Sequence, residues 1–221
     1  MIKENISNII KELPSEVKLV AVSKFKPVED ILEAYSAGQR AFGENRPQEF
    51  CAKVQDLAGR GLPEPVEWHF IGHLQTNKLK MVLPYANLVQ SVDSLHLLKE
   101  IDAWGRANGK VVNILLEMHI GAEETKQGLY EEEVLDILFD HDKYAAVRFC
   151  GLMGMASHTE DEGLIRADFE RISAFKDYLA DLFPELADFR ELSIGMSGDW
   201  KIALECGATI VRIGSAIFGQ R

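Results

Sequence analysis

The sequence has few cysteines, and their spacing matches neither a disulfide framework nor a zinc site. Only three occur among 221 residues, Cys51, Cys150 and Cys206, and none of them belongs to a C-x-x-C motif. A disulfide framework requires several pairs, and a zinc site requires clustered cysteine or histidine ligands. The sparse cysteines therefore argue against a disulfide-stabilised protein and against a zinc protein. They fit a reducing compartment, and we expect a cytoplasmic protein.

Long apolar runs are also missing. No segment approaches the roughly 18 uninterrupted apolar residues that a membrane span needs, so we expect no membrane partner. The N-terminal stretch MIKENISNIIKEL is interrupted by charges and is not the core of a signal peptide. Its isoleucines and leucine recur with helical spacing, which predicts an amphipathic helix at about residues 2–13.

Positive charge is scarce. The chain has 24 lysines and arginines against 35 aspartates and glutamates, which gives a formal net charge of −11. Such a chain is a poor general partner for the phosphate backbone of nucleic acids, so we expect no nucleic-acid binding. A small anionic ligand remains compatible with this charge, because single cations and backbone dipoles act locally.

The chain does have a regular alternation of strand-like and helix-like segments. Eight apolar segments typical of buried strands are each followed by a helical pattern, with no change in composition that would mark a domain boundary. A doubly wound open sheet is the alternative, but it rarely needs eight such units. The order predicts a single (β/α)₈ TIM barrel over residues 1–221, with strands at about 17–23, 40–42, 67–71, 88–92, 111–120, 147–153, 191–194 and 209–213.

The first predicted strand ends in a lysine. Residues 17–23 are mostly apolar, Lys24 follows them, and Pro27 can open the next helix. In a parallel barrel the carboxyl ends of the strands surround the ligand site. Lys24 is therefore either a solvated loop charge or an amine held in a pocket for Schiff-base or anion chemistry.

The ends of the seventh and eighth predicted strands fit a phosphate group. The segments SIGMS and RIGS supply small residues and hydroxyls at Ser193, Ser197, Gly214 and Ser215. Barrels often bind a phosphate between these two loops, where glycine lets backbone N–H groups approach the anion. Ordinary turn chemistry explains either segment alone. Their occurrence together favours phosphate.

Other residues at the strand ends admit two interpretations. Arg212 lies in the apolar segment IVRIG, where it either points outward or enters the barrel mouth as a fixed donor. Asn45 is either a ligand contact or a cap. Met153 is first a packing residue, although its thioether can also lie under a planar ring.

The histidines and acidic residues do not indicate a metal site. His69 and His73 lie across a strand end, so their side chains are expected to diverge, and no H-E-x-x-H motif is present. The strand ends also lack the cluster of carboxylates that is typical of a divalent-metal site. We expect no bound metal.

Seven segments resemble one known family. AVSKFKP, AGQRAFGENRPQE, EWHFIGHLQTNK, QSVDS, GLMGMA, LSIGMSGDW and VRIGSAIFGQR closely resemble the pyridoxal-phosphate homeostasis family, which is similar to the N-terminal barrel of alanine racemase. The resemblance runs from about Leu19 to Arg221. It implies a fold-type III barrel that binds pyridoxal 5′-phosphate as an aldimine with Lys24.

The resemblance also implies roles for single residues. Arg212 corresponds to the arginine that faces the pyridine nitrogen, and Asn45 lies near the ring. The phosphate would be held by Ser193, Ser197, Gly214 and Ser215, and Met153 and Met196 complete the expected cofactor-binding residues. The chain departs from the family pattern in two places, at Arg46-Pro47 after FGEN and at Met118-His119 at the end of the fifth strand.

The expected function follows from the resemblance and from the length of the chain. Only seven residues follow Gly214, so the second domain that supplies a catalytic base in barrel racemases is not expected. An arginine beside the pyridine nitrogen would also weaken the cofactor as an electron sink. We expect a monomer that buffers pyridoxal phosphate or delivers it to recipient apo-enzymes in vitamin B6 homeostasis, with little or no catalysis. The alternatives are an amino-acid racemase and a cofactor-sensing regulatory protein.

Overall fold

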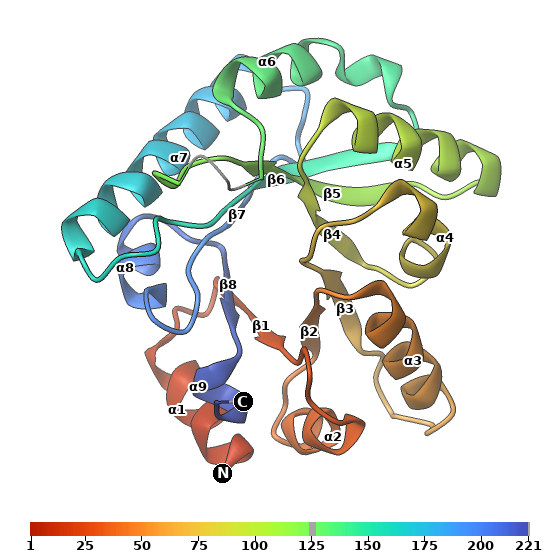
Figure 1. Ribbon diagram of the computed structural model, residues 1–221, viewed down its shortest axis with the longest axis vertical. Helices are drawn as coiled ribbons and strands as arrows, with labels where there is room; N and C mark the ends of the chain where they lie inside the picture. Colours follow the sequence, from red (N-terminus) through yellow and green to blue (C-terminus); the bar gives the residue numbers. More distant parts are fainter. Residues whose placement is uncertain (124–126, 221) are drawn as a thin grey trace.

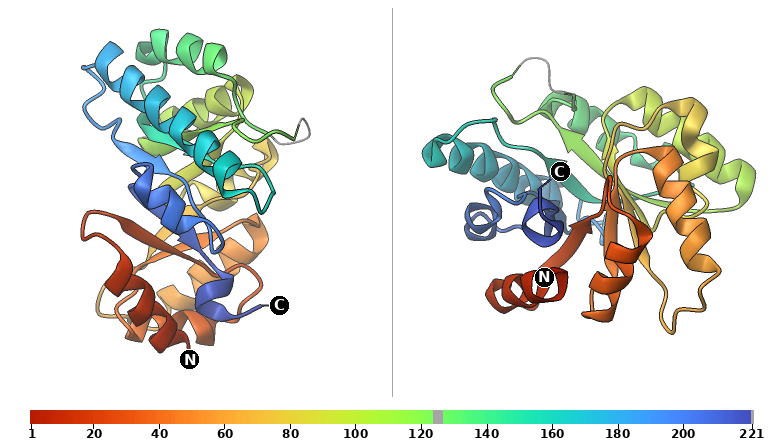
Figure 2. Two further views of the ribbon diagram at one scale, coloured as in Figure 1. Left: turned by 90° about the vertical axis from the view of Figure 1, so that its left-hand side faces the viewer. Right: turned by 60° about the horizontal axis from the view of Figure 1, so that its bottom comes forward.

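The computed structural model describes residues 1–123 and 127–220, and it contains a closed barrel of parallel strands. Neighbouring strands pair in sequence order from β1 to β8, and β8 pairs with β1 to close the ring. The helices lie outside this ring (Figures 1 and 2). The predicted (β/α)₈ barrel is confirmed.

The strands fall on the eight predicted segments, with ends that differ by a few residues at most. They are β1 (Lys18–Val22), β2 (Ala41–Glu44), β3 (Glu67–Phe70), β4 (Leu88–Val92), β5 (Val112–Met118), β6 (Val147–Gly154), β7 (Glu191–Ser193) and β8 (Ile210–Ile213). Nearly all of their residues are buried, because one face of each strand meets the barrel interior and the other meets a helix.

Helix α5 (Leu95–Asn108) begins and ends at residues that favour helix termini. At the start of α5, Ser94 Oγ accepts a hydrogen bond from Leu97 N (3.2 Å), and Gly109 ends that helix with a φ of 62°. The helices are α1 (Ile2–Glu12), α2 (Val28–Ser36), α3 (Pro47–Ala58), α4 (Leu79–Val82), α5 (Leu95–Asn108), α6 (Glu131–Phe139), α7 (Glu162–Leu182), α8 (Trp200–Glu205) and α9 (Ser215–Phe218), with 3₁₀ turns at Thr76–Lys78 and His141–Lys143.

The core has two layers. The larger lies between the strands and the helices, and it includes edge-to-face contacts of Phe50 with Trp68 and Phe70. The smaller fills the barrel interior with residues such as Val20, Leu115 and Met153. Because the interior is filled, any ligand must bind at the mouth of the barrel rather than inside it.

The first and last helices pack against each other. α1 lies beside α9, so the N-terminal helix closes the same side of the molecule as the C-terminal segment (Figure 1). The side chain of Asn5 donates a hydrogen bond to Ile217 O (2.9 Å).

Within residues 1–123 and 127–220, no helix combines the length and the apolar character that crossing a bilayer requires.

Candidate functional site

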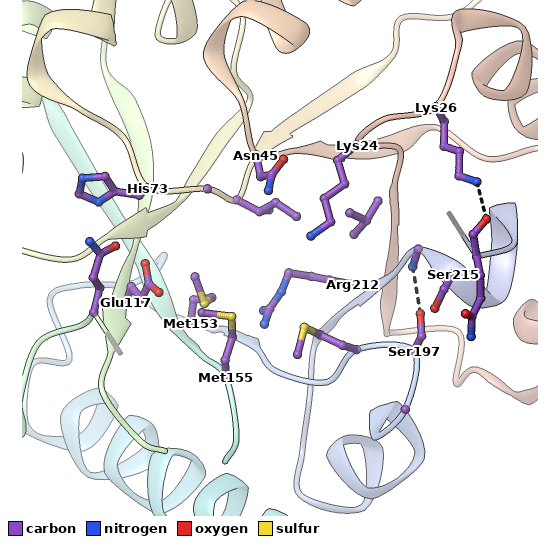
Figure 3. Close-up of a pocket in the computed structure, with 18 of the residues that line it drawn as sticks. Lys24, Lys26, Asn45, His73, Glu117, Met153, Met155, Ser197, Arg212 and Ser215 are labelled. Carbon is purple, nitrogen blue, oxygen red and sulfur yellow. Dashed lines mark hydrogen bonds between the residues drawn. The ribbon is translucent and has the colours of Figure 1, made fainter. Parts of the chain in front are cut away.

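A cavity of about 560 Å³ opens at the carboxyl ends of the strands (Figure 3). Its walls come from loops or strands at both ends of the sequence, which the closed ring places side by side. Sites for small molecules typically measure about 300–1,000 Å³. Eight of the nine predicted site residues line this cavity: Lys24, Asn45, Met153, Met196, Ser197, Arg212, Gly214 and Ser215.

Lys24 leaves the end of β1 and extends into the cavity (Figure 3). The next residue, Phe25, has a φ of 64°, which is rare for a residue with a side chain. Its backbone N–H donates to Glu49 Oε1 (2.6 Å), and the guanidinium of Arg46 lies 4.3 Å from the centre of its ring. The strained backbone next to Lys24 is thus held by Glu49 of α3 and by Arg46, the residue that precedes α3.

A buried ion network supports this loop from below. Lys53 Nζ donates to Glu44 Oε1 (2.7 Å), Glu49 Oε1 (2.6 Å) and Ser23 O (2.7 Å), and Ser23 Oγ donates to Glu44 Oε1 (2.7 Å). Burial raises the pKa of the Glu44 carboxyl, and Lys53 opposes that rise. Sequence reasoning missed this network. The signal was a charged residue on an apolar helix face, since Lys53 follows Phe50 by three positions and precedes Leu57 by four.

The loops after β7 and β8 present converging donors. The backbone N–H groups of Gly214 and Ala216 both donate to Ser197 Oγ, at 3.2 and 3.4 Å. Ser215 lines the cavity with its exposed hydroxyl. Lys26 reaches the same side, where its ammonium donates to Phe218 O (3.0 Å) (Figure 3). This end of the cavity therefore has hydroxyls, amides and a cation, which suits an anion.

Arg212 enters the cavity from β8 and is almost completely buried. Its Nη1 donates to Ser193 O (2.7 Å) and Ser193 Oγ (2.6 Å), and its Nη2 donates to Gly154 O (3.0 Å). Burial lowers the pKa of the guanidinium to about 10, which leaves it charged at neutral pH. Of the two interpretations of Arg212, the structure selects the inward one.

Ser193 is the exception among the predicted residues, and its expected phosphate contact is corrected. The side chain is fully buried and does not line the cavity. Its Oγ donates to Gln90 Oε1 (2.6 Å) while it accepts from Arg212. Ser193 faces the barrel interior below the cavity floor, whereas the loop that carries Ser197 continues to the mouth. Its contact with Arg212 makes it a support for that side chain.

A chain of polar side chains continues from this point through the barrel. Gln90 Nε2 lies 2.7 Å from His69 Nδ1, and His69 Nε2 lies 2.8 Å from Glu67 Oε1. Glu67 in turn accepts from Lys18 Nζ (2.5 Å) at the opposite end of the barrel. Desolvation lowers the pKa of His69, while the hydrogen bond from His69 helps lower the pKa of Glu67 to about 2.

His69 and His73 diverge, as their spacing predicts. His69 lies in this buried chain, whereas His73 is exposed at the cavity rim, where its Nδ1 lies 2.9 Å from Asp93 Oδ2. Over the part of the chain that the structure describes, no group of three or more histidine, cysteine or acidic side chains could hold a metal ion.

Glu117 is an acidic lining residue that sequence reasoning overlooked. It comes from β5 and lies across the cavity from Lys24 (Figure 3). Only 5 % of its surface is exposed, and burial, helped by the charge of Asp93, raises the pKa of its carboxyl to about 7. The available signal was an acidic residue inside the apolar segment VNILLEM. Met118 and His119 do not line the cavity, so β5 contributes Glu117 instead.

Asn45 connects the end of β2 to the cavity. Its Oδ1 is buried without a hydrogen-bond partner among the described residues, and its amide nitrogen faces the cavity (Figure 3). Gly72 passes close behind it, because a Cβ there would lie 2.2 Å from Asn45 O. Only glycine permits this approach of the loops after β2 and β3.

These features define a class of protein. A closed parallel barrel with a lysine, a buried arginine and converging hydroxyl and amide donors at its mouth is a barrel with a site suited to a small anionic molecule.

Comparison with known proteins makes this assignment specific. Residues 1–221 match the family model of the alanine racemase N-terminal domain. A pyridoxal phosphate homeostasis protein from Pasteurella multocida is 38% identical over 223 residues, which cover 100% of this chain and 94% of that protein. The human pyridoxal phosphate homeostasis protein is 36% identical over 230 residues, which cover 100% of this chain and 82% of that protein.

Solved structures agree with the sequence matches. PipY from Synechococcus elongatus, solved without PLP, has a TM-score of 0.93 at 35% identity, and PipY with PLP bound has a TM-score of 0.90 at 33% identity. Both matches cover 99% of this chain and 100% of PipY. Alanine racemase from Bartonella henselae shares the fold, with a TM-score of 0.73 at 15% identity over 99% of this chain and 58% of that one. This chain belongs to the pyridoxal phosphate homeostasis protein family.

Proposed function

We propose that this protein binds pyridoxal 5′-phosphate in the barrel-mouth cavity, covalently through Lys24, and that it buffers the cofactor or delivers it to recipient apo-enzymes. One observation carries the proposal: a single cavity brings Lys24 and Arg212 together with the donors around Ser197. A relative that matches over nearly its whole length has been solved with PLP bound.

The residues present fit the cofactor. A phosphate needs several N–H and O–H donors, and the hydroxyls of Ser197 and Ser215 and the amides of Gly214 and Ala216 lie at one end of the cavity. A planar ring needs apolar contacts and a few polar ones, which Met153, Met196, Asn45 and Arg212 can supply. The buried amide oxygen of Asn45 has no hydrogen-bond partner among the described residues, so this wall can accept a further hydrogen bond.

When bound, the cofactor supplies an aldehyde, with which an amine condenses to form a C=N bond with release of water. Lys24 provides that amine, and the network around Glu49 and Lys53 holds its loop. Arg212 keeps a positive charge in the cavity floor. A cation placed beside a pyridine nitrogen disfavours protonation of that nitrogen, and the resulting weak electron sink favours storage over catalysis.

The direct test is a spectral titration with pyridoxal phosphate, followed by borohydride reduction and mass mapping. We expect the wild-type protein to develop the absorbance of a cofactor–lysine imine and to carry the reduced adduct on Lys24. Lys24→Ala should lose the adduct at this position. Lys80→Ala, at an exposed lysine of α4 outside the cavity, is the matched control and should behave as wild type. A wild-type protein with no trappable adduct at Lys24 would contradict the proposal.

The two alternatives make different predictions. A racemase would interconvert L- and D-alanine or another amino acid well above the rate of the cofactor in free solution. A regulatory protein would capture a partner in a manner that depends on pyridoxal phosphate. We expect neither result, and we expect light scattering to report a monomer of about 24.8 kDa.

A further inference from the structure

The cavity has an acidic wall opposite the end that carries the donors around Ser197. We define the acidic wall by Glu117 on β5, which lines the cavity, and by Asp93 after β4, which does not line it but pairs with His73 at the rim. Figure 3 shows Glu117 and His73 on one side of the cavity and Lys26, Ser197 and Ser215 on the other, with the amine of Lys24 between them. A phosphate bound by the donors around Ser197 would leave the acidic wall to another chemical group.

Among the residues that the structure describes, none donates a hydrogen bond to the side-chain carboxyl of Glu117. Glu117 is 95 % buried, and it lines the cavity. A desolvated carboxylate without a donor is costly, and burial raises the pKa of Glu117 accordingly. A cation or donor supplied by a ligand would remove this cost.

The nearby protein cations do not serve this purpose. Arg212 attracts Glu117 through its charge, but its terminal nitrogens donate to Ser193 and Gly154. His73 also attracts Glu117 through its charge, but its Nδ1 pairs with Asp93. Arg212 and His73 therefore act on Glu117 through their charge, but neither donates a hydrogen bond to its carboxyl oxygens.

We propose that the acidic wall binds the ammonium group of a small primary amine, and that Glu117 takes its proton so that the amine can replace Lys24 as the holder of the cofactor. This inference rests on the proposed function. It names a primary amine, rather than water alone, as the reactant that frees the cofactor from Lys24.

The exchange balances without an oxidant or a further reactant. The ammonium gives one proton to Glu117, and its nitrogen becomes a nucleophile. A bond forms from that nitrogen to the carbon held by Lys24, and the bond from this carbon to Lys24 Nζ breaks. The two hydrogens that remain on the incoming nitrogen pass to Nζ, so Lys24 leaves as a neutral amine. The proton on Glu117 then passes to Lys24 or to water.

The first experiment measures release of the cofactor from the loaded protein as ethylamine is added, at constant pH and ionic strength. Tetramethylammonium, which carries a charge but no transferable proton, is the matched salt. We expect ethylamine to accelerate release in a saturable manner in the wild type and tetramethylammonium to have no such effect. In Glu117→Gln the ethylamine-dependent rate, expressed relative to the rate of the same variant without ethylamine, should fall about tenfold or more. Glu132→Gln, at an exposed position of α6, should match wild type.

A second experiment needs no cofactor. In cofactor-free protein with ¹³C-labelled glutamate, the Glu117 carboxyl should titrate at a lower pH when ethylamine is added, because a bound ammonium favours the carboxylate. An unchanged titration would overturn the inference.

The outcomes separate the two proposals. If the wild type never loads pyridoxal phosphate on Lys24, the proposed function fails. If it loads but ethylamine has no effect, or Glu117→Gln responds as wild type, only the amine site fails. If Glu117→Gln changes the absorbance of the resting loaded protein, the carboxyl acts on the cofactor itself and the amine site is likewise overturned.

Discussion

Arg212 Nη1 donates two hydrogen bonds to one residue, Ser193, at 2.7 Å to its carbonyl and 2.6 Å to its hydroxyl. The two residues lie on adjacent strands, β7 and β8, so pairing of these strands brings them together. A buried guanidinium loses its hydration, and these bonds, with the one to Gly154 O, offset the loss. Ser193 therefore fixes the plane of the only arginine that lines the described part of the cavity.

Replacement of Ser193 tests this support. Ser193→Ala removes a buried hydroxyl that accepts a hydrogen bond from Arg212 and donates one to Gln90. We expect the free energy of unfolding to fall by about 1–3 kcal/mol, and the affinity for pyridoxal phosphate to fall several-fold as Arg212 loses its fixed orientation.

Urea denaturation and the spectral titration measure these two effects. Ser15→Ala, at an exposed serine remote from the cavity, is the control and should change neither quantity. Unchanged affinity in a stable Ser193→Ala protein would show that Arg212 keeps its position without the hydroxyl.

The contact between Phe25 and Glu49 is a second testable support. Glu49→Ala removes the acceptor of the Phe25 N–H and one of the two carboxylate partners of Lys53. Without that acceptor, the positive φ of Phe25 costs about 1–2 kcal/mol with no compensating bond. We expect adduct formation at Lys24 to become about tenfold slower, measured by stopped-flow absorbance.

Gln48→Ala, one residue away on the exposed side of α3, is the matched control for this substitution. Glycine takes a positive φ without strain, so Phe25→Gly added to Glu49→Ala should recover part of the lost rate. A Glu49→Ala protein that forms the adduct at the wild-type rate would refute a positioning role for Glu49.

The raised pKa of Glu117 predicts how stability depends on pH. The carboxyl titrates at about 7 in the folded protein against an ordinary value of 4.5, so the folded state binds the proton more tightly than the unfolded state does. Its contribution to stability is therefore complete below about pH 4.5 and is lost as the pH rises to about 7. The shift corresponds to a free energy of about 3 kcal/mol.

Chemical denaturation of Glu117→Gln and wild type across this range measures the effect. The amide cannot ionise, so the variant should gain stability relative to wild type as the pH rises from 4.5 to 8. A constant difference between the two proteins over that range would contradict the assignment of the titration to Glu117.

Much of the site could be read from the order of residues. Lys24, Ser197, Gly214 and Ser215 follow segments whose apolar residues predict buried strands, and a parallel barrel collects the ends of its strands at one mouth. Such local patterns identify each strand, and topology then predicts which loops meet. The resemblance to a known family added the identity of the ligand.

Other features depended on which face of each strand turns inward. Ser193 and Ser197 are four residues apart and look alike in sequence, yet one is buried below the floor and the other lines the mouth. Glu117 stands in an apolar strand beside Met118, and only the pleat of β5 directs the glutamate, and not its neighbour, into the cavity.

The sequence by itself determined the eight strand–helix units and the lysine at the end of the first. These features follow from hydrophobic periodicity and turn chemistry, which act over a few residues. Tertiary structure alone decided that Lys53 would reach Glu44, that Ser193 would hold Arg212, and that Glu117 would face Lys24 across a cavity. Those relationships depend on closure of the barrel, which sets register and burial between segments that have no local interaction.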